Sequence, residues 1–428
     1  MNSQPSSSQT KYLNVYFQVH QPKRLKKFQF FDIGSNASYF DDALNENILK
    51  RIAQNCYLPA NKMLLKLIKK HQQIRITFSI SGVALDQLSA YAPEVLESFR
   101  ALAATGAVEF LGETYYHSLS FMVDKTEFVT QVKQHQKKVS ELFGVKPQIF
   151  RNTELIYSNG IGEVVHELGF KGMYLDGVES LLKGKTPNAL YKHPAADLIL
   201  FPRNYALSDD IAFRYSDTNW CEYPLTPNKY VSWLKGIPAD QNFIGLGLDY
   251  ETFGEHKKAD CGIFEFMQNV LSNLANDKKF QFVTPSEAIK LLEPVDVVST
   301  SKLISWADQE RDLSAWLGGD LQADAFDTLT KLHSKILGTG NAKLIADYRY
   351  LQTSDHFYYM CTKKDNDGNV HQYFSPYGSP YEAFMNYMNV LGDLELKVKN
   401  EMEKQARSHW YQFVKRETPG VNTSIAAK

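Results

Sequence analysis

The sequence predicts an α/β protein in which βα units build a parallel sheet and a mostly helical domain follows. Between residues 12 and 295, short apolar segments alternate about seven times with segments whose apolar residues have helical spacing. Past Pro294 the pattern changes, because residues 308–410 carry mainly helical spacing. At roughly 100–200 residues per domain, a chain of 428 residues allows two or three domains, or one large barrel with an appendage.

The predicted strands are short runs of apolar, β-branched and aromatic residues that end at polar or turn-forming residues. The first run ends at His-Gln-Pro (residues 20–22), and the second ends at Ser81 and Gly82. In chain order, we expect strands at residues 13–19, 74–80 and 108–111, a short strand that carries Phe150 and Arg151, and strands at residues 170–175, 198–201, 243–248 and 280–283.

The predicted helices follow from apolar residues at helical spacing and from capping residues at the helix ends. Asp124 and Glu127 have the spacing of a capping box, and Gly144 ends that helix. Thr284 and Glu287 repeat this spacing around a proline at the first helical position. In chain order, we expect helices at residues 48–70, 93–104, 124–143, 160–168, 263–274 and from 285 onward, and a hairpin around residues 364–369.

The composition argues against several classes of partner. Lys and Arg number 47 and Asp and Glu number 48, so the net charge of −1 gives no electrostatic footprint for nucleic acid or an anionic membrane. No run approaches the roughly 18 apolar residues of a membrane span, and residues 1–10 lack the features of a signal peptide. The four cysteines fit no metal-ligand spacing and are expected to be free thiols. We therefore expect a cytoplasmic protein without nucleic-acid or membrane partners, whose oligomeric state is unknown.

Four polar residues lie at or just past the C-terminal ends of predicted strands: His20, Glu113, Glu154 and Asp249. In a parallel barrel these ends all face one side, where active sites are built. A histidine and three carboxylates are therefore expected around one mouth. Glu154 is the leading candidate for chemistry; taken alone, it suits equally well a helix cap or a partner of Arg151.

Carboxylates with aromatic side chains nearby suit the cleavage of a glycosidic bond. One carboxylate attacks or stabilises the oxocarbenium-like carbon while the other protonates the leaving oxygen. Aromatic residues make up 13% of the chain, and those in polar loops are candidates for stacking on sugar faces, with core packing as the alternative. These candidates are Tyr115, Tyr116, Trp220, Tyr250, Phe253 and Trp316.

A metal site is the competing interpretation. The residues with suitable nitrogen and oxygen atoms are His20, His117, Asp249, Glu251 and His256. No His-Glu-x-x-His pattern occurs, and Gly254 interrupts the spacing from Glu251 to His256. A metal-dependent polysaccharide deacetylase is therefore disfavoured, and we expect neither a metal nor a cofactor. The sequence also lacks a Gly-rich phosphate loop and a Gly-x-Ser-x-Gly elbow, which argues against nucleotide-dependent enzymes and serine hydrolases.

Five motifs, in this order along the chain, resemble conserved regions of glycoside hydrolase family 57 and especially of its α-amylase-like branch. They are HQP (residues 20–22), GETYYH (112–117), FRNTEL (150–155), LDYETFGEH (248–256) and SWADQERDLSAWLG (305–318). A single tripeptide such as HQP is unspecific, whereas five regions in the right order are strongly specific. Many family members have Trp and Pro before the nucleophile; the Arg-Asn-Thr of residues 151–153 fits the α-amylase-like branch.

The resemblance implies an incomplete seven-stranded (β/α) barrel and a helical domain that closes over the site. We expect a disordered leader (residues 1–11), the barrel (12–295), the helical domain (296–415) and a disordered tail (416–428). By the same resemblance, Glu154 matches the nucleophile and Asp249 the general acid/base of a retaining reaction that needs no metal. The residues expected around the sugar are His20, Gln21, Glu113, Tyr115, His117, Arg151, Trp220, Glu251, His256 and Trp316.

We therefore expect a cytoplasmic retaining enzyme that acts on α-1,4-glucans and maltooligosaccharides. For retention, the carboxyl groups of Glu154 and Asp249 should lie about 5–5.5 Å apart, whereas roughly 9 Å would suit inversion. Asp249 should be the protonated partner, through burial or a neighbouring negative charge such as Glu251. A 4-α-glucanotransferase with the same residues and a non-catalytic glucan-binding homologue are the open alternatives.

Overall fold

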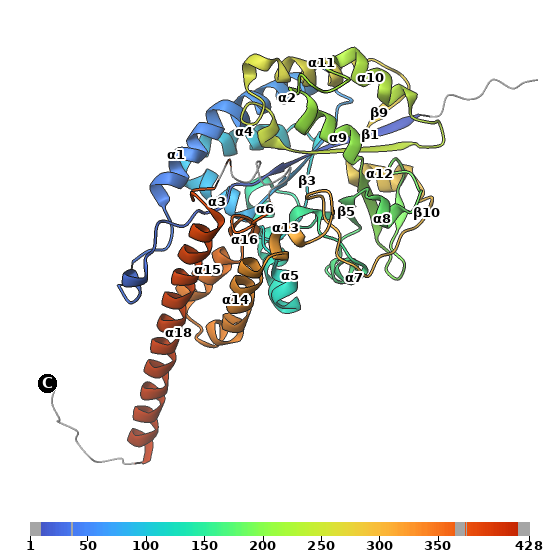
Figure 1. Ribbon diagram of the computed structural model, residues 1–428. Helices are drawn as coiled ribbons and strands as arrows, with labels where there is room; N and C mark the ends of the chain where they lie inside the picture. Colours follow the sequence, from blue (N-terminus) through green and yellow to red (C-terminus); the bar gives the residue numbers. More distant parts are fainter. Residues whose placement is uncertain (1–9, 36, 364–372, 374, 418–428) are drawn as a thin grey trace, which may run out of the picture.

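The computed structural model describes residues 10–35, 37–363, 373 and 375–417, and in these residues two five-stranded sheets are present (Figure 1). The strands are β1 (Lys11–Val19), β2 (Ile76–Ile80), β3 (Val108–Phe110), β4 (Ile149–Arg151), β5 (Gly172–Asp176), β6 (Tyr191–Lys192), β7 (Ile199–Arg203), β8 (Phe243–Asp249), β9 (Phe280–Phe282) and β10 (Asp296–Val297). One sheet has the order β3-β2-β1-β8, with β9 also paired to β1, and the other has the order β10-β6-β7-β5-β4. Only the β6–β7 pair among these is antiparallel.

Two sets of contacts join the sheets into one curled parallel sheet. Gly112, just after β3, forms a parallel bridge with Phe150 of β4. On the other side, the Asn204 N–H after β7 donates to the Gly245 carbonyl of β8 at 2.8 Å. The parallel strands therefore follow one another as β8, β1, β2, β3, β4, β5 and β7, with a looser seam between β7 and β8. This order confirms the predicted α/β class with an incomplete (β/α) barrel.

β1 lies in the middle of the barrel wall and is paired in parallel with both β2 and β8. Its odd-numbered residues from Leu13 to Val19 pack in the core between the sheet and the outer helices. Its even-numbered residues, Asn14, Tyr16 and Gln18, point to the other side, as the alternation of a strand requires. Asn14 accepts a hydrogen bond from the Tyr174 hydroxyl at 2.6 Å, and Gln18 reaches a cavity at the end of the strand. The barrel interior thus becomes polar toward its C-terminal side.

Helices cover the outside of the curled sheet and form a helical region after β10 (Figure 1). They are α1 (Asp42–Ile52), α2 (Leu58–Lys70), α3 (Gly82–Tyr91), α4 (Pro93–Ala103), α5 (Ser120–Val123), α6 (Lys125–Phe143), α7 (Asn159–Glu167), α8 (Glu179–Leu182), α9 (Tyr205–Asp209), α10 (Pro227–Gly236), α11 (Ile263–Ala275), α12 (Pro285–Leu291), α13 (Ser314–Leu317), α14 (Asp320–Gly338), α15 (Ala342–Leu351), α16 (Ser354–Tyr358) and α18 (Pro380–Glu417). Within the described chain, no helix combines the length and the apolar composition that a membrane span requires.

The helical region shares its hydrophobic core with one side of the barrel. Buried residues of α14, α15, α16 and α18 belong to the same cluster as Phe150 of β4 and Met173 of β5. Arg349 of α15 also pairs with Glu127 of α6, with Nε 2.8 Å from Oε1 and Nη2 3.0 Å from Oε2. The segment after residue 300 is thereby fixed near the C-terminal ends of the barrel strands.

The predicted elements are largely present, with shifted ends. The single helix expected at residues 48–70 is two helices, α1 and α2, joined by a π-helical segment (Ala53–Tyr57). Lys11, at the end of the expected leader (residues 1–11), pairs with Phe280 in β9. Helix α18 extends to Glu417, into the range expected for the tail (416–428). The remaining leader and tail, and the hairpin expected around residues 364–369, lie outside the described residues, and the domain boundary at residue 295 stays a prediction.

Gly247 of β8 packs against the ring of Tyr16 inside the barrel, and this contact leaves no room for a side chain. A Cβ atom at Gly247 would lie 2.2 Å from Cζ of Tyr16. We expect Gly247→Ala to lower the free energy of unfolding by about 1–3 kcal/mol, because the ring or the strand must move. Thermal unfolding followed by circular dichroism measures the loss. Gly160→Ala in α7 is the control, because an added Cβ there meets no described atom within 4 Å outside its chain neighbours and the backbone of its own helix. Equal melting temperatures of the two variants would contradict the packing argument.

Candidate active site

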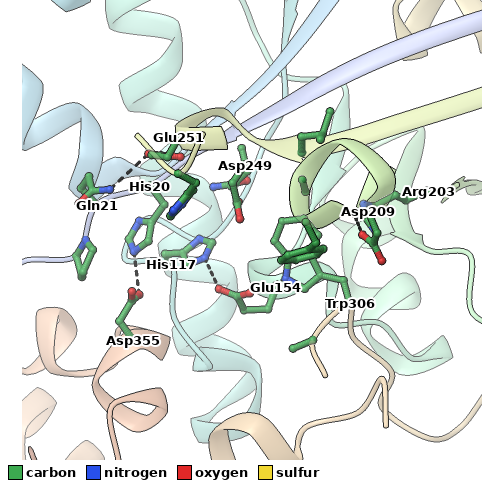
Figure 2. A pocket seen from close by; sticks show the side chains of 17 residues that line it. His20, Gln21, His117, Glu154, Arg203, Asp209, Asp249, Glu251, Trp306 and Asp355 are labelled. Atoms are coloured by element: carbon green, nitrogen blue, oxygen red, sulfur yellow. Dashed lines mark hydrogen bonds and ion pairs between the residues drawn. The ribbon is translucent and has the colours of Figure 1, made fainter. Parts of the chain in front are cut away.

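A cavity opens at the C-terminal ends of the barrel strands, beside the helical region (Figure 2). It is lined by Gln18, His20, Gln21, Pro22, His117, Glu154, Arg203, Asp209, Ala212, Phe213, Leu248, Asp249, Glu251, His256, Trp306, Ala307 and Asp355. Its polar side chains come from the ends of β1, β7 and β8, from loops after β3 and β4, and from the helical region. The structure thus gathers residues from distant parts of the chain at the barrel face where a site was expected.

Glu154 lies in the turn after β4, in a left-handed backbone conformation that non-glycine residues rarely adopt. Its φ is 55° and its ψ is 25°. Both carboxylate oxygens accept hydrogen bonds: Oε1 from Nε2 of His117 at 2.9 Å, and Oε2 from Nε1 of Trp306 at 2.7 Å. Strained conformations of this kind persist where the surroundings hold them, and they cluster at functional sites. Glu154 is therefore held in one orientation at the cavity wall.

The imidazole ring of His117 bridges two carboxylates. Its Nδ1 lies 3.1 Å from Oε2 of Glu113, and its Nε2 contacts Glu154. Burial favours the neutral ring, but the hydrogen bonds to these carboxylates outweigh burial and raise the pKa of His117 to about 9. At neutral pH the ring is a cation that donates to both partners. Glu113 itself is fully buried and also accepts a hydrogen bond from the Ser79 hydroxyl at 3.2 Å.

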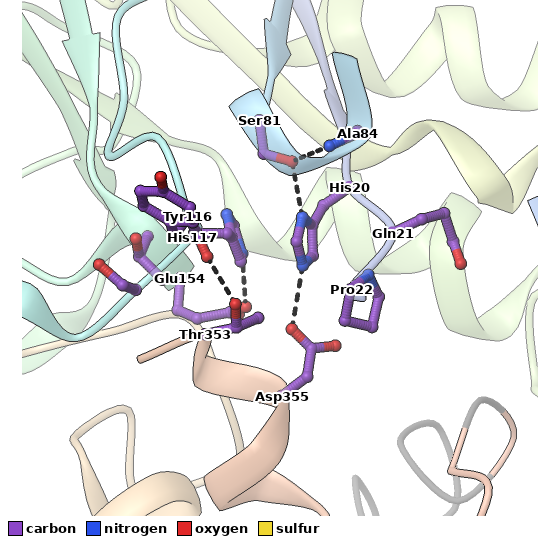
Figure 3. Close-up of polar contacts among 12 residues, drawn as sticks. His20, Gln21, Pro22, Ser81, Ala84, Tyr116, His117, Glu154, Thr353 and Asp355 are labelled. Atoms are coloured by element: carbon purple, nitrogen blue, oxygen red, sulfur yellow. Dashed lines mark hydrogen bonds and ion pairs between the residues drawn. The ribbon is translucent and has the colours of Figure 1, made fainter. Parts of the chain in front are cut away.

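His20 stacks on His117, with ring centroids 4.0 Å apart. Figure 3 shows its polar contacts: Nδ1 lies 2.7 Å from Oγ of Ser81, and Nε2 lies 3.0 Å from Oδ2 of Asp355. Burial, and then the neighbouring His117 cation, lower the pKa of His20. Nε2 of His20 donates to the Asp355 carboxylate, and Nδ1 shares a hydrogen bond with the Ser81 hydroxyl. Asp355, in α16, therefore ties the helical region to the end of β1.

Glu154 and Asp249 have opposite pKa shifts. Burial alone would raise the pKa of Glu154, but the hydrogen bond and charge of His117, followed by the Arg151 charge, lower it to about 2. For Asp249, burial and then the negative charge of Glu154 raise the pKa to about 6. Nearby cations lower the pKa of Asp249, but their effect is smaller. In mildly acidic solution Glu154 is ionised while Asp249 holds a proton. One carboxyl can therefore attack an electrophilic carbon while the other donates a proton.

Glu251 does not have the expected role of a negative neighbour. Burial, and then the charge of Asp249, raise the pKa of Glu251 to about 8, so this carboxyl is protonated at neutral pH. It contacts the Tyr57 hydroxyl, and Nε2 of Gln21 lies 3.5 Å from its Oε1. Burial, one of the two expected causes, is the larger contribution to the raised pKa of Asp249, and the neighbouring negative charge is that of Glu154 in place of Glu251.

Most of the residues predicted from the sequence come together at the cavity. Those that line it are His20, Gln21, His117, Glu154, Asp249, Glu251 and His256. Glu113 and Arg151 lie just behind the lining, and both are fully buried. Glu113 acts on the cavity through His117, and the guanidinium carbon of Arg151 lies 4.7 Å from the ring centroid of Trp306. The expected separation of about 5–5.5 Å between the two carboxyl groups stays a prediction.

The cavity lining does not include Tyr115, Trp220 and Trp316, and their expected contact with the sugar stays a prediction. Trp316 is 1% exposed and belongs to the core that the barrel shares with the helical region. The Tyr115 hydroxyl donates to Asp86 at 2.8 Å, and Trp220 packs edge to face against Trp233. These contacts are the packing that the sequence left open as the alternative.

Sequence reasoning missed six polar or aromatic residues that line the cavity: Gln18, Arg203, Asp209, Phe213, Trp306 and Asp355. Arg203 ends β7, so the strand-end rule that selected Glu154 would also have found it. Trp306 belongs to the fifth motif, where Trp316 was chosen instead. No spacing in the sequence points to Asp355 or Asp209. In the described part of the chain, no group of three or more His, Cys, Asp and Glu side chains is arranged to hold a metal ion.

Solved structures show the same fold at low sequence identity. A family 57 branching enzyme from Thermococcus kodakaraensis aligns with a TM-score of 0.66 at 13% identity, over 85% of this chain and 87% of that chain. A 4-alpha-glucanotransferase from Thermococcus litoralis aligns with a TM-score of 0.61 at 15% identity, over 82% of this chain and 56% of that longer chain. These likenesses establish the arrangement of barrel and helical region.

Sequence comparisons identify the family. A Methanocaldococcus jannaschii protein named "Putative alpha-amylase" is 39% identical over 404 residues, which make up 91% of this chain and 85% of the relative. The family model described as Glycosyl hydrolase family 57 matches residues 14–301, more than half of the chain. These residues include both Glu154 and Asp249. The chain therefore belongs to glycosyl hydrolase family 57.

Proposed function

We propose that the protein is a retaining glycoside hydrolase of the α-amylase type that acts on α-1,4-glucans and maltooligosaccharides. The feature that carries this proposal is the opposite pKa shift of two carboxyls at strand ends, with the pKa lowered to about 2 for Glu154 and raised to about 6 for Asp249. The family and the alpha-amylase name of the 39% identical relative support an α-glucan substrate.

The reaction is a double displacement. The Glu154 carboxylate attacks the anomeric carbon while Asp249 gives its proton to the leaving glycosidic oxygen, and a glycosyl ester forms as the C–O bond breaks. Ionised Asp249 then takes a proton from a water molecule that attacks the same carbon and releases Glu154. Two inversions at one carbon leave the α configuration unchanged.

The electrostatic coupling between the two carboxyls supports both halves of this cycle. The negative charge of Glu154 is one of the causes that raise the pKa of Asp249. When Glu154 becomes a neutral ester, this contribution disappears and the pKa of Asp249 falls. Asp249 is thus an acid before the first step and a base before the second.

The same residues would serve a 4-α-glucanotransferase, in which a sugar hydroxyl replaces water as the acceptor. Incubation with maltotriose, followed by chromatography of the products, separates the two activities. Glucose and maltose without longer sugars indicate hydrolysis, whereas oligosaccharides longer than maltotriose indicate transfer. A glucan-binding homologue would bind maltotriose and leave it uncut.

Glu154→Gln removes the nucleophile and keeps the size of the side chain. We expect kcat to fall by at least about a thousandfold, because an amide does not form the glycosyl ester, while maltooligosaccharide binding measured by calorimetry persists. Glu109→Gln is the control, since Glu109 of β3 pairs with Ser286 outside the cavity lining. Turnover by Glu154→Gln close to that of the unchanged protein would show that the nucleophile is misplaced.

The alkaline side of the pH profile should report Asp249. This residue must carry a proton to act as the acid, so kcat/KM should fall about tenfold per pH unit above about pH 6. Ionised Glu154 should keep the profile flat on the acidic side toward about pH 2. Glu251→Gln should leave the alkaline limb in place, because Glu251 is itself protonated up to about pH 8. A shift of the alkaline limb to lower pH in this variant would show that a negative charge on Glu251 raises the pKa of Asp249.

A further inference from the structure

Four charged side chains form a closed ring beside the cavity, and the reaction proposed above does not use them. Arg203 pairs with Asp176 (Nη1 to Oδ1, 3.2 Å) and with Asp209 (Nη2 to Oδ1, 2.6 Å). Arg311 pairs with the remaining oxygens of the same two aspartates, at 3.2 Å for Asp176 and 3.1 Å for Asp209. Each arginine therefore bridges both carboxylates, and the four charges cancel.

The ring is shielded from solvent. Asp176 is 0% exposed, Arg203 3% and Asp209 5%, and the Arg311 side chain is 23% exposed. Charges removed from water in this way are tolerated because they are paired, and removing one partner leaves another buried charge uncompensated. The planar guanidinium groups also restrict the geometry of each pair. The ring is thus a rigid point of attachment.

Three members of the ring belong to the barrel, at the ends of β5, β7 and α9, while Arg311 belongs to the segment between β10 and α13. This segment folds back on itself around Arg311. The Ser305 N–H donates to the Arg311 carbonyl at 3.0 Å, and the Arg311 guanidinium donates to the Trp306 carbonyl. The Arg311 side chain therefore joins the backbone of Trp306 to the barrel.

Trp306 in turn contacts the nucleophile twice. Its indole Nε1 donates to Oε2 of Glu154 at 2.7 Å, and its backbone N–H donates to the Glu154 carbonyl at 3.3 Å. The guanidinium carbon of Arg203 lies 5.3 Å from the centroid of the indole ring. Figure 2 shows Trp306 between Glu154 and the pair of Arg203 and Asp209. A continuous set of contacts therefore runs from the charged ring to the nucleophile.

We propose that Arg311 is a positioning residue for the nucleophile. Through its bridges to Asp176 and Asp209, it fixes the segment that carries Trp306, and Trp306 then orients Glu154. This role rests on the proposed function and extends it, because it makes a residue of the helical region a requirement for catalysis without contact to the substrate. The left-handed backbone of Glu154 explains why such support is needed.

The test is a double-mutant cycle on Arg311 and Trp306, with maltooligosaccharide as the substrate. Arg311→Lys keeps the positive charge, but its ammonium group lacks the planar fork that bridges both carboxylates. We expect kcat to fall about ten- to a hundredfold, with KM changed less than about twofold, in Arg311→Lys and in Trp306→Phe. The double variant should lose no more than Trp306→Phe alone, because both substitutions act through one hydrogen bond.

The pH profile supplies a readout that a purely structural role would not move. Without the donor at Oε2, the ionised form of Glu154 is less stable, so its pKa rises. The acidic limb of kcat/KM should therefore move to higher pH in Arg311→Lys and in Trp306→Phe.

Arg349→Lys is the matched control. Arg349 also joins the helical region to the barrel, through its two hydrogen bonds to the buried Glu127, and it lies outside the cavity lining. This variant should lower the melting temperature and leave kcat and the pH profile unchanged.

The positioning role is overturned if Arg311→Lys behaves like Arg349→Lys, or if the losses of Arg311→Lys and Trp306→Phe add in the double variant. Where Arg311→Lys does not fold, Asp176→Asn breaks the ring from the barrel side and enters the same cycle with the same criteria. An unchanged protein that does not turn over maltooligosaccharides overturns the proposed function and this role with it. An active protein with an unaffected Arg311→Lys variant overturns the positioning role alone.

Discussion

The bridge from the His117 ring to Glu113 and Glu154 is the interaction on which the site depends. A buried cation between two buried carboxylates satisfies charges that would each be costly alone. Glu113 accepts a hydrogen bond from Ser79 on β2. The bridge therefore connects the turn that carries Glu154 to a strand of the barrel and fixes its position relative to that strand. Without it, the ionised side chain of Glu154, in its left-handed turn, would keep the hydrogen bond from Trp306 and the charge of Arg151 but lose its hydrogen bond from a cation.

The same set of charges gives two chemically similar groups different tasks. Glu154 receives direct hydrogen bonds from a cation and from an indole, and these outweigh the effect of burial. For Asp249, burial is the largest contribution and the Glu154 charge adds to it, so its proton stays bound up to about pH 6. Because both carboxyls are buried, burial does not explain the difference between their pKa values. The difference arises because the hydrogen-bond donors contact Glu154. Two carboxyls at strand ends therefore do not by themselves determine which one is the nucleophile and which one is the acid. The hydrogen-bond donors that contact one of the two carboxyls decide this.

Sequence reasoning predicted the fold class and the centre of the site because both follow from local patterns. Apolar runs that end in polar residues locate strand ends, and parallel strands bring those ends to one face, which is why His20, Glu154 and Asp249 were found. Contacts made by the helical region follow no such rule. Trp306 and Trp316 belong to one motif, and only packing decides that Trp306 faces Glu154 while Trp316 is buried in the core. Asp355 of α16 contacts His20 at the end of β1, and no spacing in the sequence encodes this contact.

The central claim is that Glu154 and Asp249 work as a nucleophile and an acid/base in a double displacement. The most direct test is the anomeric configuration of the newly formed reducing end, followed by proton NMR during the first minutes of maltooligosaccharide cleavage, before mutarotation equilibrates the anomers. A double displacement at an α-linked sugar predicts that the α anomer appears first. Initial release of the β anomer would contradict the account, because it would require a single displacement by water and would leave Glu154 without a nucleophilic role.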